Sequence, residues 1–153
     1  MDLLLWRHAE AHDLQAGQTD LERCLTPKGE KQAHRVGAWL DKQLPEGTRV
    51  LCSPAMRTRQ TVAHLNRKFK VRDALSPGAS VQDLLDTAQW PLARHPVLVV
   101  GHQPVLGEVI TQLLGLEGEP LSVRKGAVWW LRRREREGVL QTTILSVICP
   151  EHL

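Results

Sequence analysis

The sequence predicts a single α/β domain, a three-layer sandwich in which helices cover both faces of a mostly parallel central sheet. Short apolar runs rich in β-branched residues alternate with amphipathic segments, the order expected when covering helices follow strands. The chain has 153 residues, of which 42% are hydrophobic and 24% are charged, as is usual for a globular protein. Because no linker or repeat divides the chain, we expect one domain over residues 1–153.

Five runs predict the strands of this sheet. The expected strands are residues 3–6, 49–52, 97–100, 127–132 and 140–147. The first three are continuous apolar runs, as expected for central strands that are buried on both faces. Between the last two, a charged run from Arg132 to Arg136 is followed by Gly138, which predicts a solvated hairpin. Docking of an acidic protein partner is the alternative interpretation of this run.

Helix start signals precede the amphipathic segments. The dipeptides Thr26-Pro27 and Ser53-Pro54 each offer an N-cap followed by proline at the first helical position. Ser80, with Asp83 three residues later, resembles a capping box. The expected helices cover approximately residues 27–40, 55–65, 81–88 and 104–114.

Three of the apolar runs lead into polar residues that suit one ligand. Arg7 and His8 follow the first run, Arg57 lies shortly after the second, and His102 follows the third. Ligands of open α/β sheets bind at the carboxyl ends of the strands, so these side chains should converge. Two guanidiniums and two imidazoles, with no carboxylate between them, predict a pocket for a dianion. Phosphate is the expected ligand, because arginine offers paired donors that match its oxygens.

At these residues the chain resembles the histidine phosphatase superfamily, and within it the small SixA-type phosphohistidine phosphatases. Four motifs agree in order and spacing. They are Leu5-Trp6-Arg7-His8-Ala9-Glu10-Ala11, Asp20-x-x-Arg23-x-Leu25-Thr26, Ser53-Pro54-x-x-Arg57-x-x-Gln60-Thr61 and Val99-Val100-Gly101-His102-x-Pro104. The resemblance implies a phosphoglycerate mutase-like fold.

The resemblance also implies a role for the strand-end residues. His8 would be the nucleophile, forming a phosphohistidine that water then hydrolyses. Arg7, Arg57 and His102 would hold the phosphoryl oxygens and stabilise the charge that develops in the transition state. Ala9 stands where the family has glycine, which disfavours a positive φ at this position.

Further matches concern the loop that borders the site in this branch. Asp20 and Arg23 lie in that loop and would contact the substrate; a surface ion pair between them is the alternative. No cofactor or metal is implied, because the cationic side chains do the work of a magnesium ion. His8-Ala9-Glu10 contains the His-x-Glu of zinc deaminases, but the Pro-Cys-x-x-Cys of that signature is absent, so we expect no metal site.

The leaving group depends on whether an acid is present. Larger members of the superfamily supply a carboxylic acid that protonates an alkoxide leaving group. The candidates for this acid here are Asp83 and Glu10. The alternative interpretations are that Asp83 caps a helix and that Glu10 is a carboxylate on a loop surface. Imidazole, whose conjugate acid has a pKa of about 6.5, leaves without such help. We therefore expect phosphohistidine in a partner protein as the substrate. The alternatives are a small-molecule phosphomonoesterase and a phosphate-binding module without turnover.

Composition narrows the location and the partners. The net charge of +3 favours anionic substrates without requiring nucleic acid, and one Phe with no Tyr leaves few residues for base stacking. The apolar runs are too short to span a bilayer, and the N-terminus lacks the pattern of a signal peptide, so we expect a cytoplasmic protein that binds no membrane.

Overall fold

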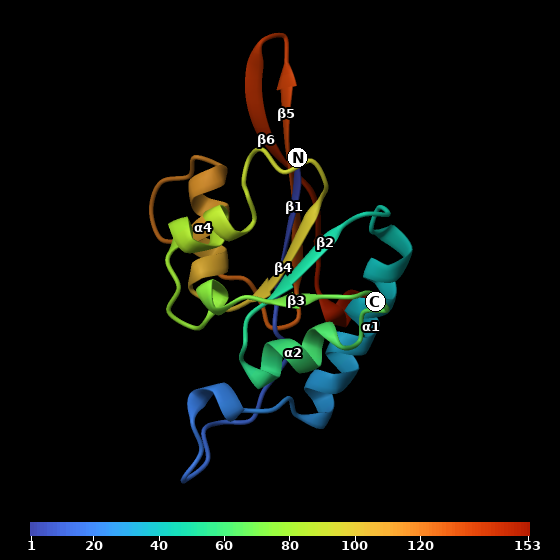
Figure 1. Ribbon diagram of the computed structural model, residues 1–153, viewed down its shortest axis with the longest axis vertical. Coiled ribbons are helices and arrows are strands. Elements are labelled where there is room, and N and C mark those ends of the chain that lie inside the picture. The colour runs from blue at the N-terminus through green and yellow to red at the C-terminus, as the bar shows by residue number, and fades with distance from the viewer.

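The chain forms a six-stranded sheet between two layers of helices, in a computed structural model that describes residues 1–153 (Figure 1). The strands are β1 (Asp2–Arg7), β2 (Arg49–Cys52), β3 (Lys70–Val71), β4 (Val97–Gly101), β5 (Val128–Arg136) and β6 (Val139–Ile148). The helices are α1 (Pro27–Gln43), α2 (Met56–Val62), α3 (Val81–Thr87) and α4 (Val105–Leu113), and the 3-10 turns are η1 (Asp20–Glu22), η2 (Asp73–Leu75) and η3 (Pro150–His152). No helix has the length and apolarity needed to cross a membrane.

The spatial order of the strands is β3-β2-β4-β1-β5-β6. β1, β2, β3 and β4 are mutually parallel. β5 pairs antiparallel with β1, and β6 pairs antiparallel with β5. The predicted α/β class, the mostly parallel sheet and the five expected strands are confirmed. Only β3 was missed, because two partly exposed residues leave no hydrophobic pattern to detect.

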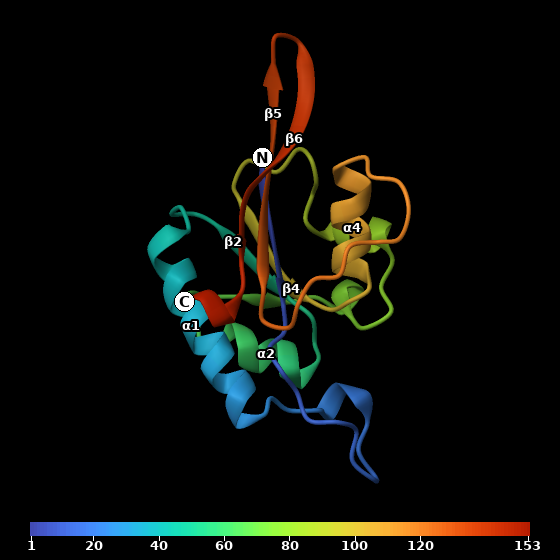
Figure 2. The same ribbon diagram turned by 180° about the vertical axis from the view of Figure 1, so that it is seen from behind.

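Alternate residues of the central strands feed two separate cores. Leu3 and Leu5 of β1 pack in one core with residues of α3 and α4, whereas Leu4 and Trp6 pack in the other with residues of α1. All four side chains are fully buried, as the alternation of a strand between two covered faces requires. Figure 2 shows α1 and α2 on one side of the sheet and α4 on the other.

Two of the predicted helix caps are present as expected. The Thr26 hydroxyl accepts a hydrogen bond from the Gly29 N–H at 3.0 Å, and α1 begins at Pro27. Ser80 and Asp83 form the predicted capping box, in which each side chain accepts from the other's backbone N–H at 3.0 Å. These contacts satisfy backbone donors that a helix start would otherwise leave unpaired.

The predicted cap of α2 is wrong. The helix begins at Met56 rather than Ala55, and Ala55 stands at the N-cap without a capping side chain. Ser53 lies too early to cap this helix; its hydroxyl accepts the Ala55 N–H at 3.2 Å and contacts His102. The dipeptide Ser53-Pro54 therefore ends a strand instead of starting a helix.

The β5–β6 hairpin extends past the amino end of β1, away from α2 (Figure 1). Glu137 and Gly138 at its tip have φ values of 52° and 78°, the backbone expected of a two-residue hairpin turn. The predicted hairpin is confirmed, but its base is not simply solvated. Arg132 pairs with Asp2 at 2.7 Å, and the Trp130 indole donates to the same carboxylate at 3.0 Å.

A substitution in α1 tests how closely this helix approaches the segment after α2. A Cβ at Gly37 would lie 2.6 Å from the His64 carbonyl oxygen. Alanine is the better helix former by about 1 kcal/mol, yet we expect Gly37→Ala to lower the free energy of unfolding by about 1–3 kcal/mol through overpacking. Urea denaturation measures this. Gly101→Ala, whose Cβ would have no neighbour nearer than 3.5 Å, should cost less; a more stable Gly37→Ala protein contradicts the close approach.

Candidate active site

The carboxyl ends of three adjacent parallel strands bring the site together. Arg7 of β1 lies opposite Gly101 of β4, and Cys52 of β2 lies opposite Val100. The His8 N–H donates to the Gly101 carbonyl at 3.1 Å, extending the sheet ladder by one residue. The residues that directly follow the three strands therefore stand side by side.

The His8 imidazole is oriented by its own loop. Its side chain is buried, and Nδ1 lies 2.7 Å from the Ala9 carbonyl oxygen. A carbonyl can only accept, so Nδ1 carries the ring proton and the lone pair of Nε2 is left free. Nε2 makes no hydrogen bond within the protein. Ala9 has no positive φ, as expected, and its N–H donates to the Thr61 hydroxyl at 3.0 Å.

His102 faces His8 with 5.4 Å between the ring centroids. Its Nε2 lies 2.7 Å from the Ser53 hydroxyl, which already accepts the Ala55 N–H. The hydroxyl has one proton, and His102 Nε2 is the acceptor within its reach. The favoured tautomer of His102 therefore carries its proton on Nδ1, which is buried without a partner and can donate to an anion.

Two guanidiniums flank the imidazoles. Arg57, in the first turn of α2, is 4% exposed and keeps its Nε buried without a partner. The Arg7 side chain donates to the Val123 carbonyl at 2.9 Å through Nη1, and its Nε is likewise unpaired. Arg7, His8, Arg57 and His102 thus lie at one edge of the sheet, with donors left free for an anion.

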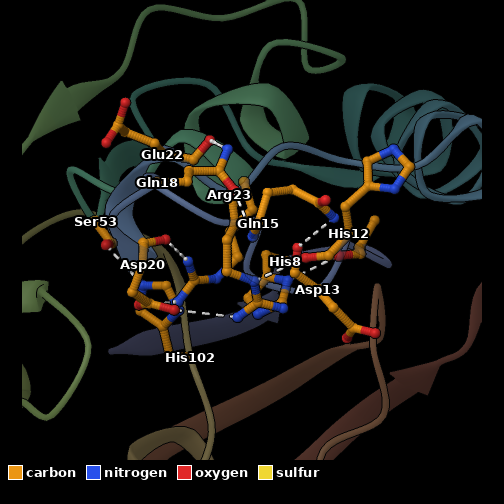
Figure 3. A network of polar contacts seen from close by, with 12 residues as sticks. His8, His12, Asp13, Gln15, Gln18, Asp20, Glu22, Arg23, Ser53 and His102 are labelled. Carbon is orange, nitrogen blue, oxygen red and sulfur yellow. Dashed lines mark hydrogen bonds and ion pairs between the residues drawn. The ribbon is translucent and has the colours of Figure 1, made fainter.

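A carboxylate is also present, so the expectation of a pocket without one is wrong. Asp20 accepts from Arg57 Nη2 at 3.0 Å, and its backbone carbonyl accepts from Nη1 at 2.8 Å. Arg23 pairs with the same carboxylate at 3.2 Å, while its Nε donates to the His12 carbonyl. Figure 3 shows Asp20 and Arg23 in one polar network with His8. The predicted ion pair exists, and it borders the site.

Burial and the neighbouring cations keep both imidazoles neutral. Desolvation, with smaller contributions from Arg57 and Arg7, lowers the pKa of His8 to about 4. Desolvation, His8 and Arg57 lower the pKa of His102 to about 3. Burial opposes ionisation of Asp20, but hydrogen bonds from Arg57 and Arg23 outweigh it and lower the pKa of that carboxyl. A neutral His8 retains the lone pair that a nucleophile needs.

Both candidate acids are hydrogen-bonded within the protein. Asp83 is occupied in the α3 capping box, and its hydrogen bonds with Ser80 lower the pKa of the exposed carboxyl. Glu10 accepts from the Thr26 hydroxyl at 2.7 Å and lines a groove beside Arg7. The cap interpretation of Asp83 is confirmed.

Three supporting residues were given no role at the site by the sequence. Ser53 orients His102, Thr61 holds the backbone of Ala9, and Gln60 accepts the Leu25 N–H at 2.7 Å, which anchors the loop that carries Asp20. All three belong to the third motif of the resemblance, and their place in this motif is the sequence feature that could have indicated a role at the site. No three His, Cys, Asp or Glu side chains are grouped so that they could hold a metal ion.

Comparisons with known proteins agree with this geometry. Residues 3–78 match the model of the histidine phosphatase superfamily (branch 1). A phosphohistidine phosphatase SixA homolog from Haemophilus influenzae is 30% identical over 131 residues, covering 75% of this chain and 78% of that protein. The structure of the protein histidine phosphatase SixA complexed with tungstate is 26% identical, with a TM-score of 0.78 and 99% of each chain covered. The structure of a proposed phosphohistidine phosphatase SixA from Nakamurella multipartitia is 28% identical, with a TM-score of 0.78, over 97% of this chain and 95% of that one.

The lowered histidine pKa values predict a pH-dependent stability. Unfolded histidines take up protons below about pH 6.5, whereas folded His8 and His102 resist protonation until about 4 and about 3. The free energy of unfolding should therefore fall as the pH drops from about 6.5 to about 4. Urea denaturation at each pH measures this. His8→Asn/His102→Gln removes both groups and should flatten the profile; an unchanged profile contradicts the assignment.

Replacing Ser53 tests the tautomer of His102. Ser53→Ala removes the donor to Nε2, so the preference of His102 for a proton on Nδ1 should be lost. The nitrogen NMR shifts of the imidazole ring report which nitrogen is protonated. Ser53→Thr retains the hydroxyl and should keep the wild-type shifts, whereas identical shifts in the alanine variant would show that Ser53 does not set the tautomer.

Proposed function

The chain belongs to the histidine phosphatase superfamily, and from this we propose that it removes phosphate from phosphohistidine in a partner protein through a covalent intermediate on His8. The observation that carries this proposal is the state of His8: a neutral imidazole with Nδ1 tied to the Ala9 carbonyl and Nε2 free, between two guanidiniums.

The first step transfers the phosphoryl group to His8. Nε2 attacks phosphorus in line with the leaving nitrogen, so the Nε2–P bond forms as the P–N bond of the substrate breaks. The Ala9 carbonyl accepts from Nδ1–H throughout and stabilises the positive charge that the ring acquires. Water then attacks the phosphohistidine, releasing inorganic phosphate and restoring neutral His8.

The surrounding donors would stabilise the phosphoryl oxygens. Arg7 and Arg57 supply fixed positive charges, and His102 supplies an Nδ1–H that has no other partner. Because these groups are preorganised by the sheet and by α2, they need not reorganise as charge develops. The same cations supply the charge stabilisation that a metal ion provides elsewhere, so we expect a metal-independent reaction.

The carboxyl groups near the site are engaged in other contacts, and this determines which leaving group the site suits. Asp83 caps a helix, Glu10 accepts from the Thr26 hydroxyl, and Asp20 is held ionised by two arginines. An alkoxide would leave slowly without a proton donor. The imidazole of a phosphohistidine, protonated on its other nitrogen, departs as a neutral ring and needs no acid. Phosphohistidine therefore suits this site better than a phosphate monoester. The SixA relatives from Haemophilus influenzae and Nakamurella multipartitia, named as phosphohistidine phosphatases, support the same substrate.

Trapping the intermediate tests the covalent mechanism. Brief incubation of the enzyme with labelled substrate and a base quench should yield an acid-labile, base-stable phosphoenzyme. His8→Ala should abolish it and lower turnover by about a thousandfold or more. His34→Ala, which removes an exposed histidine of α1, is the matched control and should retain both. A phosphoenzyme that persists in His8→Ala would exclude His8 as its site.

A substrate panel separates the proposal from its alternatives. Phosphohistidine peptide should be hydrolysed faster than sugar phosphates, and a chelator should leave the rate unchanged. Faster hydrolysis of alkyl esters would make the protein a phosphomonoesterase. Binding of phosphate compounds without any turnover would make it a binding module.

A further inference from the structure

A polar groove is lined in part by Arg7, and its other lining residues have no part in the chemistry above. Its volume is about 340 Å³, and no hydrophobic side chain lines it. The lining residues are Arg7, Glu10, Lys28, Gln32, Ser122, Arg124, Lys125 and Glu151. We call it the basic groove. Arg7 belongs both to the groove and to the proposed phosphate site, so the two share this side chain.

The charges of the basic groove are not balanced. It has four cations and two carboxylates, and both carboxylates already have partners. Glu10 accepts from the Thr26 hydroxyl at 2.7 Å, and Glu151 pairs with Arg124 at 3.5 Å. The cations that make no ion pair are Arg7, Lys28 and Lys125. With Arg124 and Glu151 paired, three cations and the Glu10 carboxylate face the groove, which leaves it a net charge of +2.

One wall of the basic groove is fastened to the phosphate site. The Gly126 N–H donates to the His8 carbonyl at 3.0 Å, and the Arg7 N–H donates to the Ala127 carbonyl at 3.0 Å. Gly126 has a φ of 76°, and a Cβ there would lie 2.8 Å from Pro150 Cγ. Because the backbone directly after Lys125 is held in this way, the backbone of Lys125 keeps a set position relative to His8.

The opposite wall is the first turns of α1. Lys28 projects from this helix, and Gln32 accepts the Glu10 N–H at 2.9 Å through Oε1. This hydrogen bond ties the backbone of Glu10 to α1. A ligand in the groove would meet Lys28 on one side and Lys125 on the other while still lying beside Arg7.

We propose that the basic groove binds acidic side chains of the protein substrate that lie within a few residues of its phosphohistidine. This inference rests on the proposed function and names the sequence feature that the enzyme would recognise. Single carboxylates can pair with Lys28 and Lys125, and the amides of the peptide can meet Gln32 and Ser122. Nucleic acid fits less well, since the groove has no aromatic residue for base stacking and contains two carboxylates.

Binding without phosphate provides the direct test. An unphosphorylated peptide rich in Asp and Glu, titrated into the protein at low ionic strength, should shift the backbone NMR signals of residues 28–32 and 122–126. A peptide of the same length with Gln and Ser should not. Lys28→Glu/Lys125→Glu should abolish the shifts, whereas Lys42→Glu/Lys68→Glu makes the same change in net charge on exposed residues outside the groove and should keep them.

Turnover provides the second test. On a phosphohistidine peptide with acidic flanks, Lys28→Glu/Lys125→Glu should lower kcat/KM on the order of tenfold, with the loss fading at high salt. Hydrolysis of an aryl phosphate should stay within about twofold of wild type, which also shows that the variant is folded.

Different results would overturn the role of the basic groove and the proposed function. Equal NMR shifts from the acidic and neutral peptides, or shifts that survive Lys28→Glu/Lys125→Glu, would overturn the role of the groove. An oligonucleotide that displaces the acidic peptide and binds more tightly would also overturn it. Acidic binding that depends on the groove, in a protein that does not hydrolyse phosphohistidine, would instead overturn the proposed function and leave the groove assignment standing.

Discussion

The parallel pairing of β1 and β2 on either side of β4 is the constraint on which the whole site depends. The register sets Arg7 against Gly101 and Cys52 against Val100, so the residues after each strand meet at one edge. Two covered cores hold this register, because a shift of one residue would move every apolar side chain to the wrong face. The geometry of the candidate active site therefore depends on the packing of both cores.

Burial then determines the chemistry of the two histidines. The same desolvation that costs stability at low pH keeps His8 and His102 neutral, and their ring protons are directed by one carbonyl and one hydroxyl. Asp20 orients the Arg57 side chain, as the carbonyl and the hydroxyl orient the two imidazoles. A buried guanidinium without a partner is costly, and the Asp20 carboxylate, 48% exposed, compensates this charge from the rim while leaving Arg57 Nε free.

Most of the architecture was predictable because its signals are local. Apolar runs, N-caps and a glycine turn locate five strands and the start of two helices, and the ends of three strands bring Arg7, His8, Arg57 and His102 to one edge of the sheet. One error arose at Ser53, whose hydroxyl has two possible hydrogen-bonding roles. Ser53 has the chemistry of a helix cap, but its hydroxyl lies against His102 once β2 and β4 are neighbours; a single sequence does not reveal which partner is nearer.

By itself, the sequence determined the α/β class, the two-sided burial of the central strands and the cationic residues at their ends. These properties follow from hydrophobic period and residue chemistry, which need no knowledge of distant contacts. Only the tertiary structure decided that Asp20 returns to Arg57, that Ser53 orients His102, and that Lys28 and Lys125 face one groove. Each of these joins residues far apart in the chain, and their proximity is a product of packing.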